Sequence, residues 1–305
     1  MSELVGALGR VGVLYGGVSS EREISLASGS AVSESLMRLS IENILIDVAD
    51  DLLNKLELFK PDRVFVALHG PGGEDGTIQG LLEYLRIPYT GSGIVASALA
   101  MDKLRCKLMW RGLGLPTAEF MTLDAKSDWQ AVLESLGGKV VVKPCREGSS
   151  IGMSVVGNSQ DLEVAWQHAK QFDKEVIAER RLTGEEYTVA ILDGEALPAV
   201  RISTDSEFYD FAAKYHSNKT NYHCPSGLST QHERDLLDLC KRAFKSLDCR
   251  DWGRVDVMAD ENGAFHLLEV NTVPGLTSHS LVPKAASAAG ISFDQLVLKI
   301  IEASL

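Results

Sequence analysis

The chain has 305 residues, of which 45% are hydrophobic and 24% charged, the balance of a globular protein with room for two or three compact units. Its formal net charge is −12 without any basic run, which argues against nucleic acid as a partner. We find no signal peptide, no apolar run near the roughly 18 residues of a membrane span and no Cys-x-x-Cys spacing among the 5 cysteines, so we expect a cytoplasmic protein with reduced thiols and no membrane partner.

The first third of the chain alternates strands and helices. The expected elements are strands at 11–15, 43–48 and 63–68, a helix ending near residue 39 and a helix at 77–86. This rhythm predicts a parallel sheet flanked by helices, with ligands at the carboxyl ends of the strands. Glycine-rich loops follow two of these strands, at 16–17 and 69–76.

Two side chains near these loops have alternative interpretations. Glu21 begins the first helix, where an acid commonly interacts with the helix dipole, but it could instead point into the cleft and pair with a substrate ammonium group. His69 ends a strand, where histidine is more often structural than a substrate contact.

The middle of the chain predicts a second, mixed unit. One helix is expected over 92–113, followed by strands at 139–143, 153–156 and 175–179 and a helix at 161–172. Residues 148–152, Gly-Ser-Ser-Ile-Gly, could be a flap whose amides wrap phosphates, although a plain hairpin turn has the same composition and the Walker spacing is absent. Lys103 and Lys143 flank this segment, but most lysines are simply solvated.

The last third begins with predicted strands at 187–192 and 197–202. The polar segment 203–227 has no strong period and is longer than an ordinary connector, so we expect a functional loop in which Lys214 and Tyr215 are either lid contacts or surface residues. Helices are expected at 230–247, 282–289 and 293–303.

A β-hairpin is predicted for residues 252–260 and 264–271. Asn262-Gly263 favours a two-residue type I′ turn, which would place Asp256 opposite Glu269 and Arg254 opposite Asn271 on one face. Facing carboxylates repel unless a cation lies between them, and Asp, Glu and Asn oxygens suit Mg²⁺ or Mn²⁺. The alternatives are a solvated hairpin with exposed acids, or a three-residue turn with a bulge that shifts the register.

Two further features follow the hairpin. Gly275, after Pro274, could offer a backbone amide to a developing oxyanion. Residues 277–280, Thr-Ser-His-Ser, precede a helix and could be a structural cap or a carboxylate site.

Several long motifs in one order resemble the D-alanine:D-alanine ligase family of the ATP-grasp superfamily. They are GGVSSEREISL at 16–26, LHGPGGEDGTIQG at 68–80, YTGSG at 89–93, MDK at 101–103, VKPCREGSSIGM at 142–153, AKYHS at 213–217, GRVDVM at 253–258 and LLEVNTVPGLTSHSLVP at 267–283.

The resemblance implies an α/β fold with three-domain ATP-grasp architecture: an N-terminal parallel α/β domain at 1–97 for the first D-alanine, and two α+β domains that sandwich ATP. The latter are a central lid domain at 98–183 and a catalytic domain at 184–305 with a mobile loop at 203–227. ATP would phosphorylate the carboxylate of one D-alanine, and the amine of a second would attack the acyl phosphate, giving D-alanyl-D-alanine for peptidoglycan. Homodimers are usual in the family.

The resemblance also implies roles for individual residues. Two Mg²⁺ or Mn²⁺ ions would be held by Asp256, Glu269 and Asn271, and ATP by Lys103, Lys143, Ser150, Glu179 and Glu186. The D-alanine sites and the catalytic groups would comprise Glu21, His69, Ser149, Lys214, Tyr215, Arg254, Gly275, Ser280 and Leu281.

Tyr215, rather than the phenylalanine of related depsipeptide ligases, favours an amine nucleophile. Cys145, where the family often has serine, suggests sensitivity to thiol reagents, and Val273 stands where a small polar residue is frequent. The rival interpretations are an ATP-grasp ligase with another product and a nucleotide-binding protein without catalysis.

Overall fold

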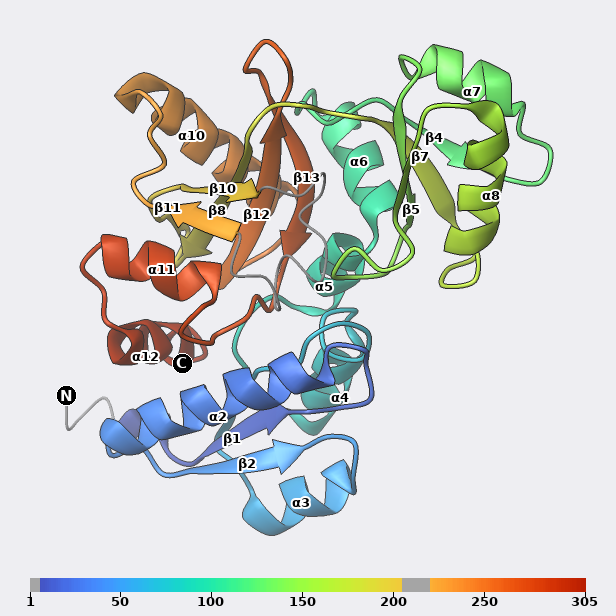
Figure 1. The fold of residues 1–305 in the computed structure, drawn as a ribbon. Helices are drawn as coiled ribbons and strands as arrows, with labels where there is room; N and C mark the ends of the chain where they lie inside the picture. The colour runs from blue at the N-terminus through green and yellow to red at the C-terminus, as the bar shows by residue number, and fades with distance from the viewer. Residues whose placement is uncertain (1–5, 205–219) are drawn as a thin grey trace.

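The computed structural model describes residues 6–204 and 220–305 and contains three β-sheets (Figure 1). The first sheet is parallel, with strand order β2-β1-β3. Its strands and helices are β1 (Val11–Tyr15), α2 (Arg22–Arg38), β2 (Asn43–Asp47), α3 (Leu52–Phe59), β3 (Arg63–Val66) and α4 (Thr77–Leu85). The predicted parallel unit is therefore present, with α3 as an element that no pattern had indicated.

The second sheet is antiparallel, with strand order β4-β7-β5-β6. Helices α7 and α8 accompany it in the part of Figure 1 drawn in green. Its elements are β4 (Phe120–Leu123), α7 (Trp129–Ser135), β5 (Val140–Pro144), β6 (Ser154–Val156), α8 (Ser159–Ala169) and β7 (Val176–Arg180).

The third sheet has the order β11-β10-β8-β12-β13, with β9 paired to β8. Its elements, and the helices that follow or cover it, are β8 (Glu186–Leu192), β9 (Glu195–Ala196), β10 (Val200–Thr204), β11 (Thr220–His223), α10 (Thr230–Ser246), β12 (Trp252–Ala259), β13 (Phe265–Asn271), α11 (Leu281–Ala288) and α12 (Phe293–Glu302). Strands β10 and β11 pair with each other, so the segment predicted as an irregular loop at 203–227 begins as strand at 203–204 and contains a second strand at 220–223.

The single helix predicted over 92–113 is wrong. Two helices occupy this region, α5 (Ile94–Met101) and α6 (Lys103–Gly112), and Asp102 between them has an extended backbone. The Asp102 side chain accepts a hydrogen bond from the Arg105 amide, because a new helix N-terminus has unpaired amides that a carboxylate can satisfy. The break places Lys103 at a helix start, and its amide donates to the Cys145 carbonyl in the second sheet.

The buried apolar clusters do not correspond one to one with the three units along the chain. One buried cluster contains β1 and β3, a face of β8 and β10, and the helices α11 and α12. Helix α12 also contacts α2, to which the Arg38–Asp294 ion pair of 2.7 Å joins it. A separate cluster fills the second sheet with α7 and α8. The N-terminal sheet and the C-terminal helices therefore share one core, while the second sheet has its own.

Within residues 6–204 and 220–305, none of the helices combines the length and the apolar character needed to cross a bilayer.

Gly253 lies where β12 meets α10 most closely. A Cβ atom there would lie 2.5 Å from the Phe244 ring and 2.9 Å from the Asn271 carbonyl oxygen. We expect Gly253→Ala to lower the free energy of unfolding by about 1–3 kcal/mol in urea titrations, because neither neighbour can move away freely. The control is Gly112→Ala at the end of α6, where a Cβ atom meets no other segment of the chain within 4 Å and where the change should not destabilise and can add up to about 1 kcal/mol through helix propensity.

Candidate functional site

Two cavities meet where the three units come together. The larger has a volume of about 670 Å³ and lies between the second and third sheets, and the smaller, of about 120 Å³, faces the N-terminal unit. Lys103, Glu147, Ser149 and Glu269 line both. Every predicted site residue in the described part of the chain lines at least one of them, whereas Lys214 and Tyr215 lie outside the described residues.

The β12–β13 hairpin places Asp256 opposite Glu269 and Arg254 opposite Asn271, as predicted. The predicted two-residue turn is wrong. The Gly263 amide donates to the Asp260 carbonyl, and Asp260 pairs with Ala264, which leaves three residues in the loop. This turn alone would shift the register by one, but the irregularity between Asp256 and Val257 adds one residue on β13 and restores the pairing.

The facing carboxylates already have cationic partners from the protein. Arg254 donates to Asp256 from Nε at 2.8 Å and from Nη2 at 2.7 Å, and the Lys103 ammonium lies 3.2 Å from Glu269. Thr188 and Asn271 also donate to Asp256, at 2.6 and 3.1 Å. The inference that only a metal ion could reconcile the two acids is therefore corrected, because Arg254 and Lys103 do so here.

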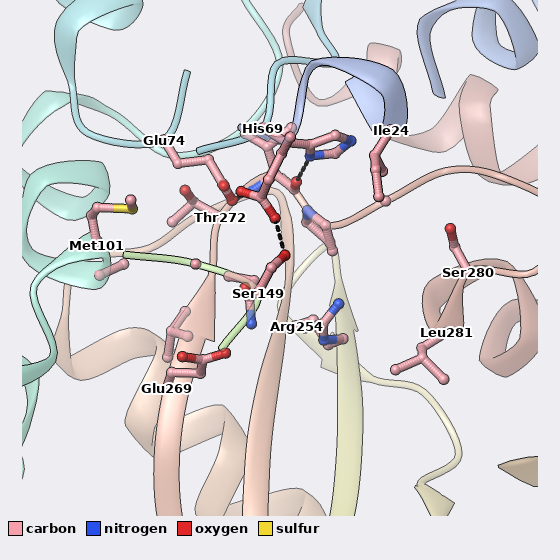
Figure 2. A pocket seen from close by; sticks show the side chains of 18 of the residues that line it. Ile24, His69, Glu74, Met101, Ser149, Arg254, Glu269, Thr272, Ser280 and Leu281 are labelled. Atoms are coloured by element: carbon pink, nitrogen blue, oxygen red, sulfur yellow. Dashed lines mark hydrogen bonds between the residues drawn. The ribbon is translucent and has the colours of Figure 1, made fainter. Parts of the chain in front are cut away.

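Glu21 reaches across to the flap, residues 147–152, and does not cap its helix. The Ser149 hydroxyl donates to Glu21 Oε1 at 2.5 Å (Figure 2), while α2 has no side-chain cap. Ser149 and Ser150 both have positive φ, 51° and 62°, which L-residues seldom adopt, so the flap stores some backbone strain. This geometry favours the cleft interpretation of Glu21 over the dipole interpretation.

The position of His69 favours a structural role over a direct substrate contact. Its Nδ1 lies 2.7 Å from the Val273 carbonyl (Figure 2), and its Nε2 lies 3.0 Å from the Ser28 hydroxyl. The same hydroxyl accepts a hydrogen bond from the Leu276 amide at 3.1 Å. Burial lowers the pKa of His69, so the ring is neutral. Both ring nitrogens are thus engaged in holding the 272–276 loop.

Glu74 is a half-buried acid of the smaller cavity that the sequence analysis missed. It accepts hydrogen bonds from the Gly70 amide at 2.7 Å and from the Val273 amide at 3.2 Å, and so joins the glycine-rich loop 69–76 to the 272–276 loop. Burial, with the charge of Glu21, raises the pKa of Glu74 to about 8. Its signal in the sequence was an acid between glycines in a loop at a strand end.

Gly275, Ser280 and Leu281 lie together at one end of the smaller cavity. A Cβ on Gly275 would lie 2.9 Å from the Ser280 hydroxyl, so the close approach of the two requires glycine. Ser280 accepts a hydrogen bond from the Thr277 amide at 3.0 Å, and Leu281 begins α11. Figure 2 shows Arg254 facing the same region as Ser280 and Leu281.

The larger cavity carries the predicted nucleotide residues. Lys103 donates to the Glu147 carbonyl at 2.7 Å, at the start of the flap. Burial acts against its charge, but the pair with Glu269 outweighs this and raises the pKa of Lys103. Lys143 lies 3.0 Å from Glu179, and Ser150 and Glu186 line the same cavity. Ammonium groups, a flexible flap and acids thus surround a space that suits a nucleotide.

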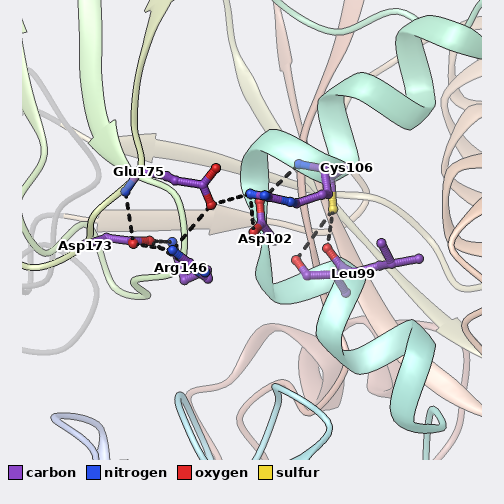
Figure 3. A network of polar contacts seen from close by, with 8 residues as sticks. Leu99, Asp102, Cys106, Arg146, Asp173 and Glu175 are labelled. Atoms are coloured by element: carbon purple, nitrogen blue, oxygen red, sulfur yellow. Dashed lines mark hydrogen bonds and ion pairs between the residues drawn. The ribbon is translucent and has the colours of Figure 1, made fainter. Parts of the chain in front are cut away.

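An ion-pair network fixes the base of the flap (Figure 3). Arg146, which precedes it, holds Asp173 through Nη2 at 2.6 Å and Nε at 3.0 Å, while Glu175 lies 2.5 Å from Arg105. Arg105 also pairs with Asp102 at 2.9 Å. The network connects the flap to the break between α5 and α6.

Cys145 is not a reactive thiol in this structure. It is fully buried against Leu104 and Ile177, and burial raises its pKa to about 12. The hypothesis of thiol sensitivity at this position is therefore wrong for the folded state. We expect no labelling of Cys145 by iodoacetamide at pH 7.5 in the native protein and complete labelling in urea, as read by mass spectrometry of tryptic peptides.

Comparisons with known proteins agree with this arrangement. Family models described as D-ala D-ala ligase C-terminus and N-terminus match residues 109–302 and 49–92. A D-alanine–D-alanine ligase of Saccharophagus degradans is 56% identical over 98% of this chain and 95% of its own, and one of Chromohalobacter salexigens is 55% identical over 96% and 94%. A crystal structure of the Bacillus anthracis ligase complexed with ATP superposes with a TM-score of 0.86 at 35% identity and covers 97% of both chains. The chain belongs to the D-alanine–D-alanine ligase family.

Proposed function

We propose that the protein joins two D-alanine molecules at the expense of ATP, through a D-alanyl phosphate, with release of ADP and phosphate. The observation that carries this proposal is the meeting of the two cavities at Lys103 and Glu269. A nucleotide-sized space opens there into a small polar one, so a γ-phosphate and a carboxylate can be brought together. Phosphoryl transfer needs this positioning and charge neutralisation more than a covalent nucleophile.

In the smaller cavity, Glu21 accepts the ammonium group of the first D-alanine, and Ser149 fixes the orientation of Glu21. Arg254 and the Gly275 amide stabilise the oxyanion that forms when the second amine attacks. Ser280 and Leu281 hold the carboxylate of the second D-alanine near the start of α11. Lys214 and Tyr215 would complete the site from the segment between β10 and β11.

In the larger cavity, Lys103, Lys143 and Ser150 bind the phosphates, Glu179 faces the adenine and Glu186 the ribose. Asp256, Glu269 and Asn271 would hold two Mg²⁺ or Mn²⁺ ions, since their oxygen donors share one face of the hairpin and suit a hard cation. When bound, these ions neutralise charge on the transferred phosphoryl group. Arg254 forms an ion pair with Asp256, and Lys103 forms one with Glu269. The bound ions would displace these two side chains from the acids.

We also propose a pathway, a cellular location and an oligomeric state for the protein. The product would serve peptidoglycan synthesis in the cytoplasm, and the protein would act as a homodimer. The exposed apolar side chains of Tyr84 on α4 and of Ile94 and Val95 on the neighbouring α5 support such an association. Light scattering at micromolar concentration would report twice the chain mass.

The deciding experiment measures phosphate release from ATP and Mg²⁺ with and without D-alanine. We expect release that depends on D-alanine, and its absence would overturn the proposal in favour of nucleotide binding without catalysis. Offering D-alanine, D-lactate and D-serine together and identifying the product by mass spectrometry separates dipeptide from depsipeptide synthesis.

A further inference from the structure

Three charged side chains meet in the wall of the larger cavity. Glu179 is 2% exposed, and its Oε2 lies 3.0 Å from the ammonium of Lys143 and 3.3 Å from that of Lys107. Its other oxygen, Oε1, is buried and has no hydrogen-bond partner among the described residues. Because an orphaned carboxylate oxygen is costly to bury, this atom is placed to accept a hydrogen bond from a donor that enters the cavity.

The two lysines differ in what they can reach. Lys143 lines the larger cavity, so its ammonium can turn from Glu179 to a phosphate. Lys107 lines neither cavity and its side chain is 0% exposed, so it cannot contact a ligand. If Lys143 moves to ATP, Lys107 is the remaining close cation of Glu179.

Lys107 is also fixed to the third sheet. Its ammonium donates to the Thr117 hydroxyl at 2.7 Å, and this hydroxyl donates to the Leu267 carbonyl at 2.9 Å. The Leu267 amide in turn donates to the Pro116 carbonyl. Leu267 precedes Glu269 by two residues on β13. Lys107 therefore joins the adenine side of the cavity, on β7, to the strand that carries Glu269.

We propose that Lys107 is a positioning residue that serves as the permanent counter-ion of Glu179, keeping its carboxylate charged and Oε1 aimed at the exocyclic amino group of adenine while Lys143 serves the phosphates. This inference rests on the proposed function, in which Glu179 faces the adenine. Lys107, although it does not line the cavity, would thus contribute to the selection of adenine over other bases.

The charges around this group predict a pH dependence. Burial raises the pKa of Glu179, but Lys107 and Lys143 outweigh it and the net shift is downward. Burial lowers the pKa of Lys107 to about 8, and Lys143 adds to this against the attraction of Glu179. The groups that face Lys107 are Glu179, Lys143 and the neutral thiol of Cys106, and Lys103 lies near Glu179. Above pH 8, Lys107 loses its charge.

The test compares ATP with purine riboside triphosphate, which lacks the exocyclic amino group. For Lys107→Met we expect the KM for ATP to rise by about 10- to 100-fold, the effect of losing a charge-assisted hydrogen bond, with the KM for the analogue and kcat changed by less than about threefold. Thr117→Val should move the KM for ATP in the same direction by less, and Lys245→Met, an exposed lysine on α10, should change neither.

Equal rises in the KM for both nucleotides would show a general structural defect and overturn the proposal, as would an unchanged KM for ATP. Glu179→Gln separates this failure from that of the proposed function. If Glu179→Gln loses the preference for ATP and Lys107→Met keeps it, only the assignment of Lys107 is wrong. If Glu179→Gln keeps the preference, the adenine contact of Glu179 and the assignment of Lys107 are both wrong, whereas the proposed ligation is overturned only by the absence of D-alanine-dependent phosphate release. Should Lys107→Met not fold, the unmodified protein decides, since its KM for ATP must rise above pH 8 while that for the analogue stays flat.

Discussion

Replacing Glu269 by glutamine should lower kcat for D-alanine-dependent phosphate release on the order of 10²–10³-fold. Glutamine keeps the shape of the side chain but removes the charge that faces Asp256 across the hairpin and that pairs with Lys103 at 3.2 Å. The phosphoryl group would then be transferred without one anionic ligand for its divalent ions, so the Mg²⁺ concentration for half-maximal activity should also rise.

Unfolding of Glu269→Gln in urea should remain cooperative with an unchanged m-value, which separates lost chemistry from a lost fold. The matched control is Glu195→Gln, an exposed acid on β9, for which turnover and Mg²⁺ dependence should equal those of the parent. Turnover of Glu269→Gln within a few-fold of the parent would refute the metal assignment.

Replacing Arg254 by methionine is expected to have two effects of opposite sign. The loss of the guanidinium should lower kcat on the order of 10²–10³-fold, because its donors would no longer stabilise the oxyanion. The same change removes the guanidinium that donates two hydrogen bonds to Asp256, at 2.8 and 2.7 Å. A divalent ion then no longer competes with Arg254 for the Asp256 carboxylate and should bind more tightly. Steady-state kinetics across a Mg²⁺ titration measure both effects.

Arg254→Lys should recover only part of the rate, since one ammonium cannot reproduce two parallel donors. Arg242→Met, an exposed arginine on α10, is the control and should leave both quantities unchanged. A kcat for Arg254→Met close to that of the parent would remove Arg254 from the oxyanion site, and weaker Mg²⁺ binding would contradict competition at Asp256.

The β12–β13 hairpin shows which structural features local sequence patterns can predict and which they cannot. The alternation of apolar and polar residues and the Asn262-Gly263 pair correctly predicted two strands and the facing of Asp256 and Glu269. The turn type was wrong and the bulge went unforeseen, and the two errors cancel. Register near a turn depends on residues such as Asp260, whose side chain accepts amides of the loop, and no periodicity reports such contacts.

Burial was the part of the site that the sequence could not reveal. Lys107 and Glu74 have the spacing of ordinary surface residues, and only the approach of distant segments makes one a buried cation and the other a half-buried acid with a raised pKa. The break at Asp102 was missed because residues 92–113 keep a helical pattern across it. The parallel unit, in contrast, was predicted correctly because short apolar strands alternate with helical segments along the sequence, a pattern that needs no knowledge of long-range contacts.

The two sides of the cleft differ in how they are packed, because the N-terminal sheet and the C-terminal helices share one core while the second sheet has a separate one. Residues of β1, β3, α11 and α12 form one stiff frame, so the amino-acid side of the cleft cannot widen without tearing apolar contacts. The second sheet has a core of its own and joins this frame through α6 and the hydrogen bond from the Leu267 amide to the Pro116 carbonyl. If ATP binds as proposed, we expect nucleotide entry and ADP departure to occur by rotation of that sheet, with the amino-acid pocket preserved between turnovers.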